Sequence, residues 1–146
     1  MRALIQRVKQ AKVEVNGKTV GQIEHGLLVF VGLGKTDTLQ TSEKLLKKLL
    51  AYRVFSDDSG RMNLNVEQVN GGVLLVSQFT LMAETKKGLR PDFGPAMPPD
   101  AANTLFAQML EQAKVLYPQV QTGEFGADMQ VSLVNDGPVT FMLEME

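Results

Sequence analysis

The feature that most constrains the fold is an Asn16-Gly17 pair set between two stretches rich in β-branched residues. Val13 and Val15 precede the pair, and Val20 and Ile23 follow it. Asn-Gly readily supplies the two positive-φ positions that a tight two-residue hairpin turn requires. This part of the chain is therefore predicted to be a β-hairpin.

Several other stretches have the character of strands. The first residues of the chain alternate apolar with polar side chains, which indicates a first strand rather than a signal peptide. An apolar run between Gly26 and Gly32-Leu33-Gly34 suits a central strand that is buried on both faces. The expected strands are residues 1–8, 27–31, 73–79, 129–134 and 139–145, with residues 135–138 as the turn between the last two.

Two segments have helical periodicity. Leucines recur at helical spacing over residues 38–53, and Asp37 with Gln40 forms a capping-box pattern at the start of that segment. Pro99 suits the first turn of a second helix, whose apolar stripe continues until Pro118. The glycine- and proline-rich stretch between residues 82 and 99 is predicted to be a long loop.

These elements predict the fold class. At 146 residues, the chain is expected to form one domain spanning residues 1–146. Runs of strands with two helices between them are typical of α+β proteins, with antiparallel or mixed sheets curled into a sandwich- or barrel-like core and two main helices covering one side.

Composition excludes several kinds of chemistry. The chain has no cysteine, so it has no disulfide, no thiolate nucleophile and no cysteine-bound zinc, and a cytosolic location is expected. Its one histidine, His25, lies in a predicted turn, which argues against a Ser-His-Asp triad and against a histidine-rich metal site. Gly32 to Thr36 lacks the spacing of a phosphate-binding loop. No metal, no other cofactor and no membrane partner are therefore expected.

The net charge of the chain does not indicate that it binds nucleic acid. The formal net charge is -1, whereas domains that bind nucleic acid are commonly basic. Any contact with RNA is therefore expected to be local.

Two short motifs contain residues that are unusual in segments with a purely structural role. In Ser77-Gln78-Phe79-Thr80-Leu81, three hydrogen-bonding side chains follow a buried strand, either to line a pocket or to satisfy backbone at a strand edge. In Asn135-Asp136-Gly137-Pro138-Val139-Thr140, the Gly-Pro step is either an ordinary turn or a cis peptide that presents two neighbouring carbonyls to an amine.

Together these two motifs closely resemble the D-aminoacyl-tRNA deacylase family, also called D-tyrosyl-tRNA deacylases. The resemblance extends over the whole chain, through segments 2–8, 62–66, 85–91 and 129–134 in the family's order. Glu84 stands where aspartate is more usual, and residues 93–99 are variable, which affects the expected rim of the pocket and not the activity.

The resemblance implies hydrolysis of the ester bond in D-aminoacyl-tRNA, rejection of L-aminoacyl-tRNA, and glycyl-tRNA as a secondary substrate. It implies a homodimer in which the Gly137-Pro138 turn, in cis, reaches into the partner's pocket and holds the substrate's α-amino group. It assigns catalytic positions to Ser77, Gln78, Phe79 and Thr80, and substrate-binding positions to Gly137, Pro138, Met129 and Ala96.

Two mechanisms stay open at this point. Thr80 could attack the ester carbonyl, but a threonine hydroxyl needs a nearby base and the sequence marks none. Alternatively, backbone N-H groups near Phe79 and Thr80 stabilise the oxyanion while the 2′-hydroxyl of the terminal adenosine helps to activate water. The second route fits the missing histidine, cysteine and metal ligands and is preferred.

Basic residues supply candidate contacts with the tRNA acceptor stem. Lys86, Lys87 and Arg90 lie on the proline-bounded loop, and Arg7 is a further candidate. Each could equally be an ordinary solvated charge. Two rival functions remain, an RNA-binding module without turnover and a general hydrolase of small esters.

Overall fold

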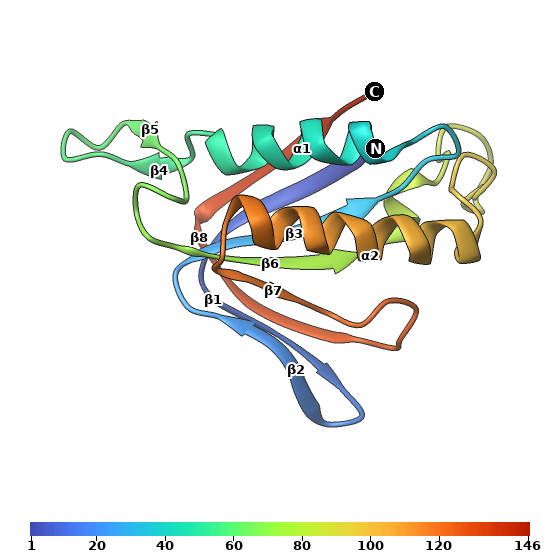
Figure 1. Cartoon of the computed structure of the whole chain (residues 1–146), viewed down its shortest axis with the longest axis horizontal. Helices are drawn as coiled ribbons and strands as arrows, with labels where there is room; N and C mark the ends of the chain where they lie inside the picture. Colours follow the sequence, from blue (N-terminus) through green and yellow to red (C-terminus); the bar gives the residue numbers. More distant parts are fainter.

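The computed structural model describes all residues from 1 to 146. Its main sheet has six strands in the order β2-β1-β3-β6-β7, with β8 paired to β1, and the two helices cover one side of it (Figure 1). The mixed sheet is nearly closed into a barrel, which confirms the predicted α+β class. The elements are β1 (Arg2–Val15), β2 (Lys18–Ile23), β3 (Gly26–Gly32), α1 (Leu39–Ala51), β4 (Phe55–Ser56), β5 (Met62–Leu64), β6 (Gly72–Ser77), the 3₁₀ helix η1 (Phe79–Met82), α2 (Pro99–Leu116), β7 (Val120–Thr122) and β8 (Gln130–Glu144).

The hairpin and the central strand form as predicted. Asn16 and Gly17 both have positive φ, at 49° and 77°, and connect the antiparallel strands β1 and β2. Strand β3 lies between β1 and β6, antiparallel to the first and parallel to the second, and all but one of its residues are buried. The parallel pairing places the C-terminal ends of β3 and β6 side by side, with Val31 opposite Ser77.

The end of the chain differs from the prediction of two strands joined by a turn. Strand β8 runs from Gln130 to Glu144 and pairs with β1 along almost its whole length. At residues 135–140 the register slips, because Asn135 pairs with Val8 while Thr140 pairs with Gln6. The Gly137-Pro138 segment is thus a bulge that projects from one strand, since β1 continues to pair on both sides of it.

The first helix also differs at its start. The predicted capping box of Asp37 and Gln40 is wrong, because the N-cap is Thr38, which exchanges capping hydrogen bonds with Thr41. Leu39 belonged to the predicted apolar stripe but is 43% exposed. The Asp37 carboxylate instead accepts hydrogen bonds from the Gly34 N-H and from the Met1 ammonium group.

The core has two parts. The larger cluster lies between the sheet and the helices and includes Leu45, Leu49, Phe106 and Met109. The smaller cluster lies inside the curled sheet, between β1, β2, β3 and β6. Gly21 of β2 lies so close to Thr122 of β7 that a Cβ there would come within 2.3 Å of the Thr122 carbonyl oxygen, so glycine lets these strands approach. Neither helix is long and apolar enough to cross a membrane.

Candidate active site

A cavity of about 500 Å³ opens at the C-terminal ends of β3 and β6, beside the start of α2. Ten of its fifteen lining residues are hydrophobic, and no lining residue has a titratable side chain. Ser77, Gln78, Phe79, Ala96 and Met129, all predicted as site residues, contribute to its wall. A cavity of this kind can accept an apolar side chain but has no side-chain acid or base of its own.

The end of β6 positions the polar part of the wall. The Gln78 N-H donates to the Val31 carbonyl at 2.8 Å, which carries the pairing with β3 one residue beyond the strand. The chain then turns into η1, where the N-H groups of Phe79 and Thr80 occupy the first two positions. N-H groups at a helix start have no intrahelical acceptor, so these two are free to bind an oxyanion.

Thr80 lies next to the cavity and does not line it. Its hydroxyl donates to the Gln78 side-chain carbonyl at 2.7 Å. An amide oxygen does not accept the proton as a base would, so the structure provides no activating group for a threonine nucleophile.

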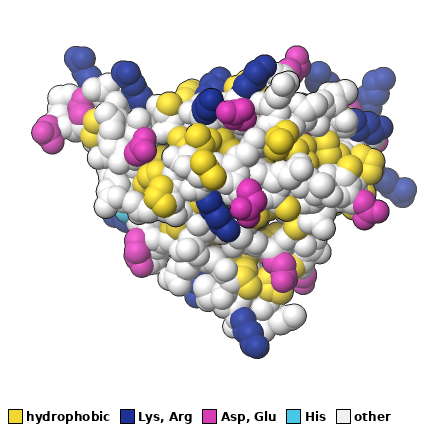
Figure 2. Space-filling model, in the orientation of Figure 1, with side chains coloured by type: hydrophobic (Ala, Val, Ile, Leu, Met, Phe, Trp, Pro, Cys, Tyr) yellow, Lys and Arg dark blue, Asp and Glu magenta, His cyan; other side chains and the backbone are white.

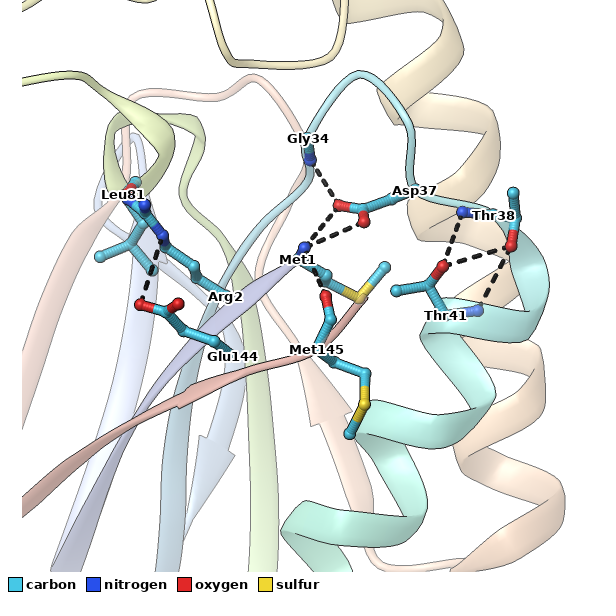
Figure 3. A network of polar contacts seen from close by, with 9 residues as sticks. All are labelled: Met1, Arg2, Gly34, Asp37, Thr38, Thr41, Leu81, Glu144 and Met145. Atoms are coloured by element: carbon cyan, nitrogen blue, oxygen red, sulfur yellow. Dashed lines mark hydrogen bonds and ion pairs between the residues drawn. The ribbon is translucent and has the colours of Figure 1, made fainter.

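Arg2 supports η1 from the first strand. Its guanidinium donates to the Leu81 carbonyl at 3.0 Å and lies 3.8 Å from the Glu144 carboxylate (Figure 3). A Cβ on Gly32 would come within 3.0 Å of the Leu81 side chain, so η1 also packs directly against β3.

Aromatic residues from the long loop and from the segment before β8 complete the cavity. Phe93 lies against Phe79 with a ring-centroid distance of 5.0 Å, and Phe79 is 58% exposed. Phe93, Phe125 and the neighbouring Met97 were not among the predicted site residues. Phe93 lies in the predicted long loop rich in glycine and proline, and because loops of this length are often functional, its place there was the one signal that could have found it.

The Gly137-Pro138 peptide is cis, and both residues are exposed. They do not line the cavity of their own chain. They lie instead beside Arg7, which pairs with Leu27 near the N-terminal end of β3. The turn and the cavity are therefore at opposite ends of the same central strands.

Arg7 has contacts different from those expected of an RNA-binding residue. Its side chain is only 12% exposed, and it donates to the Asp136 carbonyl at 3.1 Å and to the Val54 carbonyl at 2.8 Å. Its Nε also lies 3.5 Å from the Asp136 carboxylate. These contacts make Arg7 a support of the Gly137-Pro138 segment, a role that sequence could not reveal because 129 positions separate the partners.

The other basic candidates remain accessible. Lys86, Lys87 and Arg90 are exposed, and none of them forms an ion pair. Their loop is closed by paired hydrogen bonds between Glu84 and Asp92, at 2.7 and 3.1 Å. On the face shown in Figure 2, basic and acidic side chains are interspersed over the helices and no block of one sign forms there.

Titratable groups with shifted pKa values lie away from the cavity. Hydrogen bonds from Ser59 and Arg61 lower the pKa of Asp57, which lies on the exposed turn between β4 and β5. Burial, with a smaller effect from the Glu67 carboxylate, raises the pKa of Tyr117 at the end of α2. His25 packs edge-on against Phe55, with ring centroids 5.1 Å apart, and no group of three or more His, Asp or Glu side chains is arranged to hold a metal ion.

Comparison with known proteins identifies relatives over the full length. A family model described as D-Tyr-tRNA(Tyr) deacylase matches residues 4–144. A protein named D-aminoacyl-tRNA deacylase from Acinetobacter baumannii is 63% identical over 146 residues, covering 100% of this chain and 99% of that protein. One of the same name from Psychrobacter arcticus is 58% identical over 150 residues, covering 99% of each.

Solved structures agree in fold. One titled c-Myc DNA Unwinding Element Binding Protein superposes with a TM-score of 0.94 at 41% identity, covering 99% of this chain and 98% of that one. A probable eukaryotic D-amino acid tRNA deacylase superposes with a TM-score of 0.84, covering 97% of each chain, and at 18% identity it is similar in fold alone. The chain belongs to the D-Tyr-tRNA(Tyr) deacylase family.

Proposed function

We propose that this chain hydrolyses the ester bond of D-aminoacyl-tRNA and releases the D-amino acid and the tRNA. The observation that carries this function is the cavity wall at Ser77, Gln78 and Phe79, where the start of η1 offers free N-H groups beside an apolar space. The relatives that match the whole chain are named for the same reaction.

Catalysis rests on position and on backbone dipoles. Water adds to the ester carbonyl carbon, and the negative charge that develops on the carbonyl oxygen is bound by the N-H groups of Phe79 and Thr80. The bond to the 3′-oxygen of the terminal adenosine then breaks, and that oxygen takes up the proton that the water releases. Because no titratable side chain lines the cavity, the adenosine 2′-hydroxyl assists this proton transfer.

Chirality is selected mainly by exclusion. The backbone carbonyls of the Gly137-Pro138 turn hold the α-amino group of the substrate, so the side chain of a D-residue finds room and that of an L-residue collides with the turn. Glycine has no side chain to collide, so glycyl-tRNA is a secondary substrate. Because the mainly apolar cavity does not bind one particular side chain, many D-amino acids are accepted.

The selecting turn comes from a second copy of the chain. Within one copy, Leu27, beside Arg7, and Val31, at the cavity, are four positions apart along β3, which is about 13 Å of strand. Helix α1 gives an independent measure, because its 13 residues span about 20 Å between the cavity end and the Val54 carbonyl that binds Arg7. A homodimer in which each turn enters the partner's cavity closes this distance.

The acceptor stem of the tRNA contacts the loop before α2. Lys86, Lys87 and Arg90 are exposed on that loop and are free of acidic partners, as phosphate contacts require. Binding through them falls as salt is added. We place this activity in the cytosol, where aminoacyl-tRNA is used.

The test is deacylation of D-tyrosyl-tRNA and L-tyrosyl-tRNA at equal concentration, without added metal, with D-tyrosine methyl ester as a third substrate. Release from D-tyrosyl-tRNA alone supports the proposal. Binding of both tRNAs without turnover would support a binding module instead. Equal turnover of the methyl ester would support a general esterase.

The role of Thr80 has its own test. Thr80→Ala removes a hydroxyl whose contact is the Gln78 amide, and we expect it to lower kcat by less than about tenfold. A nucleophilic hydroxyl would instead be indispensable, so complete loss of single-turnover hydrolysis in Thr80→Ala, with activity retained in Thr80→Ser, would favour covalent catalysis. Thr80→Ser separates loss of the hydroxyl from loss of the methyl group.

A further inference from the structure

The connection between β3 and α1 contains a carboxylate that the proposed reaction does not use. The Asp37 side chain is only 5% exposed. It accepts a hydrogen bond from the Gly34 N-H at 2.6 Å, and both of its oxygens lie 2.9 Å from the α-ammonium group of Met1 (Figure 3). That ammonium group also donates to the Met145 carbonyl at 3.0 Å.

Capping of α1 does not account for Asp37. Thr38 is the N-cap, its hydroxyl accepts from the Thr41 N-H, and the Thr41 hydroxyl accepts from the Thr38 N-H (Figure 3). Asp37 turns away from the helix toward Gly34, whose carbonyl also accepts from the Asp37 N-H at 3.2 Å. The carboxylate therefore closes the connection onto itself.

The same connection forms one wall of the cavity. The Lys35 N-H donates to the Pro95 carbonyl at 3.2 Å, and the Met97 N-H donates to the Leu33 carbonyl at 2.9 Å. These bonds place Gly34 directly opposite Ala96 in an isolated antiparallel bridge. Leu33, Ala96 and Met97 all line the cavity.

We infer that Asp37 is a positioning residue for substrate binding, which holds Gly34 in place so that Leu33 and the segment from Pro95 to Met97 keep the cavity wall in register. This inference rests on the proposed function and adds a residue outside the cavity to it. The buried carboxylate gains two contacts, one from an N-H group and one from a cation, and each fixes the other's geometry. A wall held in this way is set before the substrate arrives.

Loss of Asp37 is expected to affect binding more than chemistry. The wall at Ala96 and Met97 belongs to the segment that pairs with Gly34, whereas the N-H groups of Phe79 and Thr80 belong to η1, which β3 and Arg2 hold separately. Asp37→Ala leaves the Gly34 N-H without its acceptor and leaves the Met1 ammonium with the Met145 carbonyl alone. Asp37→Asn keeps an oxygen for Gly34 and loses the charge.

The experiment measures kcat and KM for D-tyrosyl-tRNA in four proteins: wild type, Asp37→Ala, Asp37→Asn and Val66→Ala. Val66 is fully buried beside Gly71, at the opposite end of the central strands, so Val66→Ala lowers the Tm without touching the cavity wall. Amide hydrogen exchange at Lys35 and Met97 is followed in the same proteins as a readout that needs no activity.

We expect Asp37→Ala to raise KM by roughly tenfold with kcat changed less than about threefold, and Asp37→Asn to recover part of the loss. Exchange at Lys35 and Met97 should accelerate in Asp37→Ala and stay slow in Val66→Ala. An unchanged KM together with unchanged exchange in Asp37→Ala would overturn the inference, as would an equal rise of KM in Val66→Ala. If the wild type bound D-tyrosyl-tRNA without turnover, the proposed function would fail, and the exchange rates alone would decide the role of Asp37.

Discussion

At the C-terminal ends of β3 and β6 the chain encloses an apolar cavity without titratable side chains, whereas at their N-terminal ends Arg7 and Asp136 support an exposed Gly137-Pro138 segment. The first region has space for a substrate and N-H donors for an oxyanion, but it lacks the main-chain carbonyls that are proposed to bind the substrate's α-amino group. The second has exposed main chain and no cavity. The difference teaches that the features of the proposed site lie at two separate ends of one copy, and the proposed homodimer would bring the two ends of different copies together.

The largest expected effect is on kcat, and two substitutions distinguish the role of the Phe79 N-H from the role of its ring. Phe79→Pro removes an N-H at the first position of η1, where proline is tolerated, and the preceding Gln78 already has a non-helical backbone with φ -145° and ψ 84°. Phe79→Ala removes only the ring. We expect kcat of Phe79→Pro to lie about 10²- to 10³-fold below that of Phe79→Ala in single-turnover assays, because one oxyanion donor is lost. Equal kcat values would assign no catalytic role to this N-H.

The next effect concerns selection at the other end. A Cβ at Gly137 would come within 2.7 Å of the Val139 side chain, and φ is 132° there, so Gly137→Ala must displace the turn. We expect the preference for D- over L-tyrosyl-tRNA to fall about 10- to 100-fold while turnover of the D-substrate persists. Gly17→Ala is the matched control, because its φ is also positive, at 77°, and nothing lies near its Cβ. If Gly137→Ala kept the wild-type preference for D-tyrosyl-tRNA, the turn would have no role in chiral selection.

A smaller effect tests whether RNA contacts belong to the cavity end. Replacing Lys86, Lys87 and Arg90 with glutamine should weaken tRNA binding by roughly tenfold at moderate salt and make its salt dependence shallower. Lys44→Gln, Lys48→Gln and Lys114→Gln together remove the same charge from exposed helical positions. Filter binding over a range of salt compares the two triple variants, and identical slopes would argue against a specific role for the loop.

The smallest effect is on stability at alkaline pH. The Tyr117 hydroxyl donates to the Gly71 carbonyl at the N-terminal end of β6, and burial raises the pKa of this phenol above its ordinary value of 10.0. The folded chain therefore holds this proton more tightly than the unfolded chain does. Its contribution is fully present below pH about 10 and is lost as pH rises through the raised pKa. Chemical denaturation should show a steeper alkaline loss of stability in the wild type than in Tyr117→Phe.

Structural features that depend on neighbouring residues could be predicted from the sequence. Asn16-Gly17 predicts its hairpin because the turn depends on two adjacent residues, and Pro99 predicts the start of α2 for a similar reason. The motif Ser77 to Thr80 was located correctly at the end of a buried strand, and three of its four residues line the cavity.

Contacts between residues far apart in the chain could not be predicted from the sequence. The continuity of β8 depends on β1, which lies more than a hundred residues away, so residues 135–138 had the pattern of a turn between two strands. Asp37 was assigned to a helix cap because its partner Met1 is 36 positions distant. Arg7 was a candidate RNA contact, and charge alone did not reveal that the Asp136 and Val54 carbonyls lie beside it.

Mixed dimers test most directly whether one site is built from two copies. Chains carrying Phe79→Pro have a defective cavity and an intact turn, whereas chains carrying Gly137→Ala have the reverse. Coexpressed with different affinity tags, the two variants form mixed dimers that can be purified. If each turn serves the partner's cavity, one site of the mixed dimer combines an intact cavity with an intact turn, and we predict about half of the wild-type rate with wild-type preference for D-tyrosyl-tRNA. If each turn serves its own chain, the mixed dimer will show only the relaxed selectivity of Gly137→Ala, and that result would contradict the shared site.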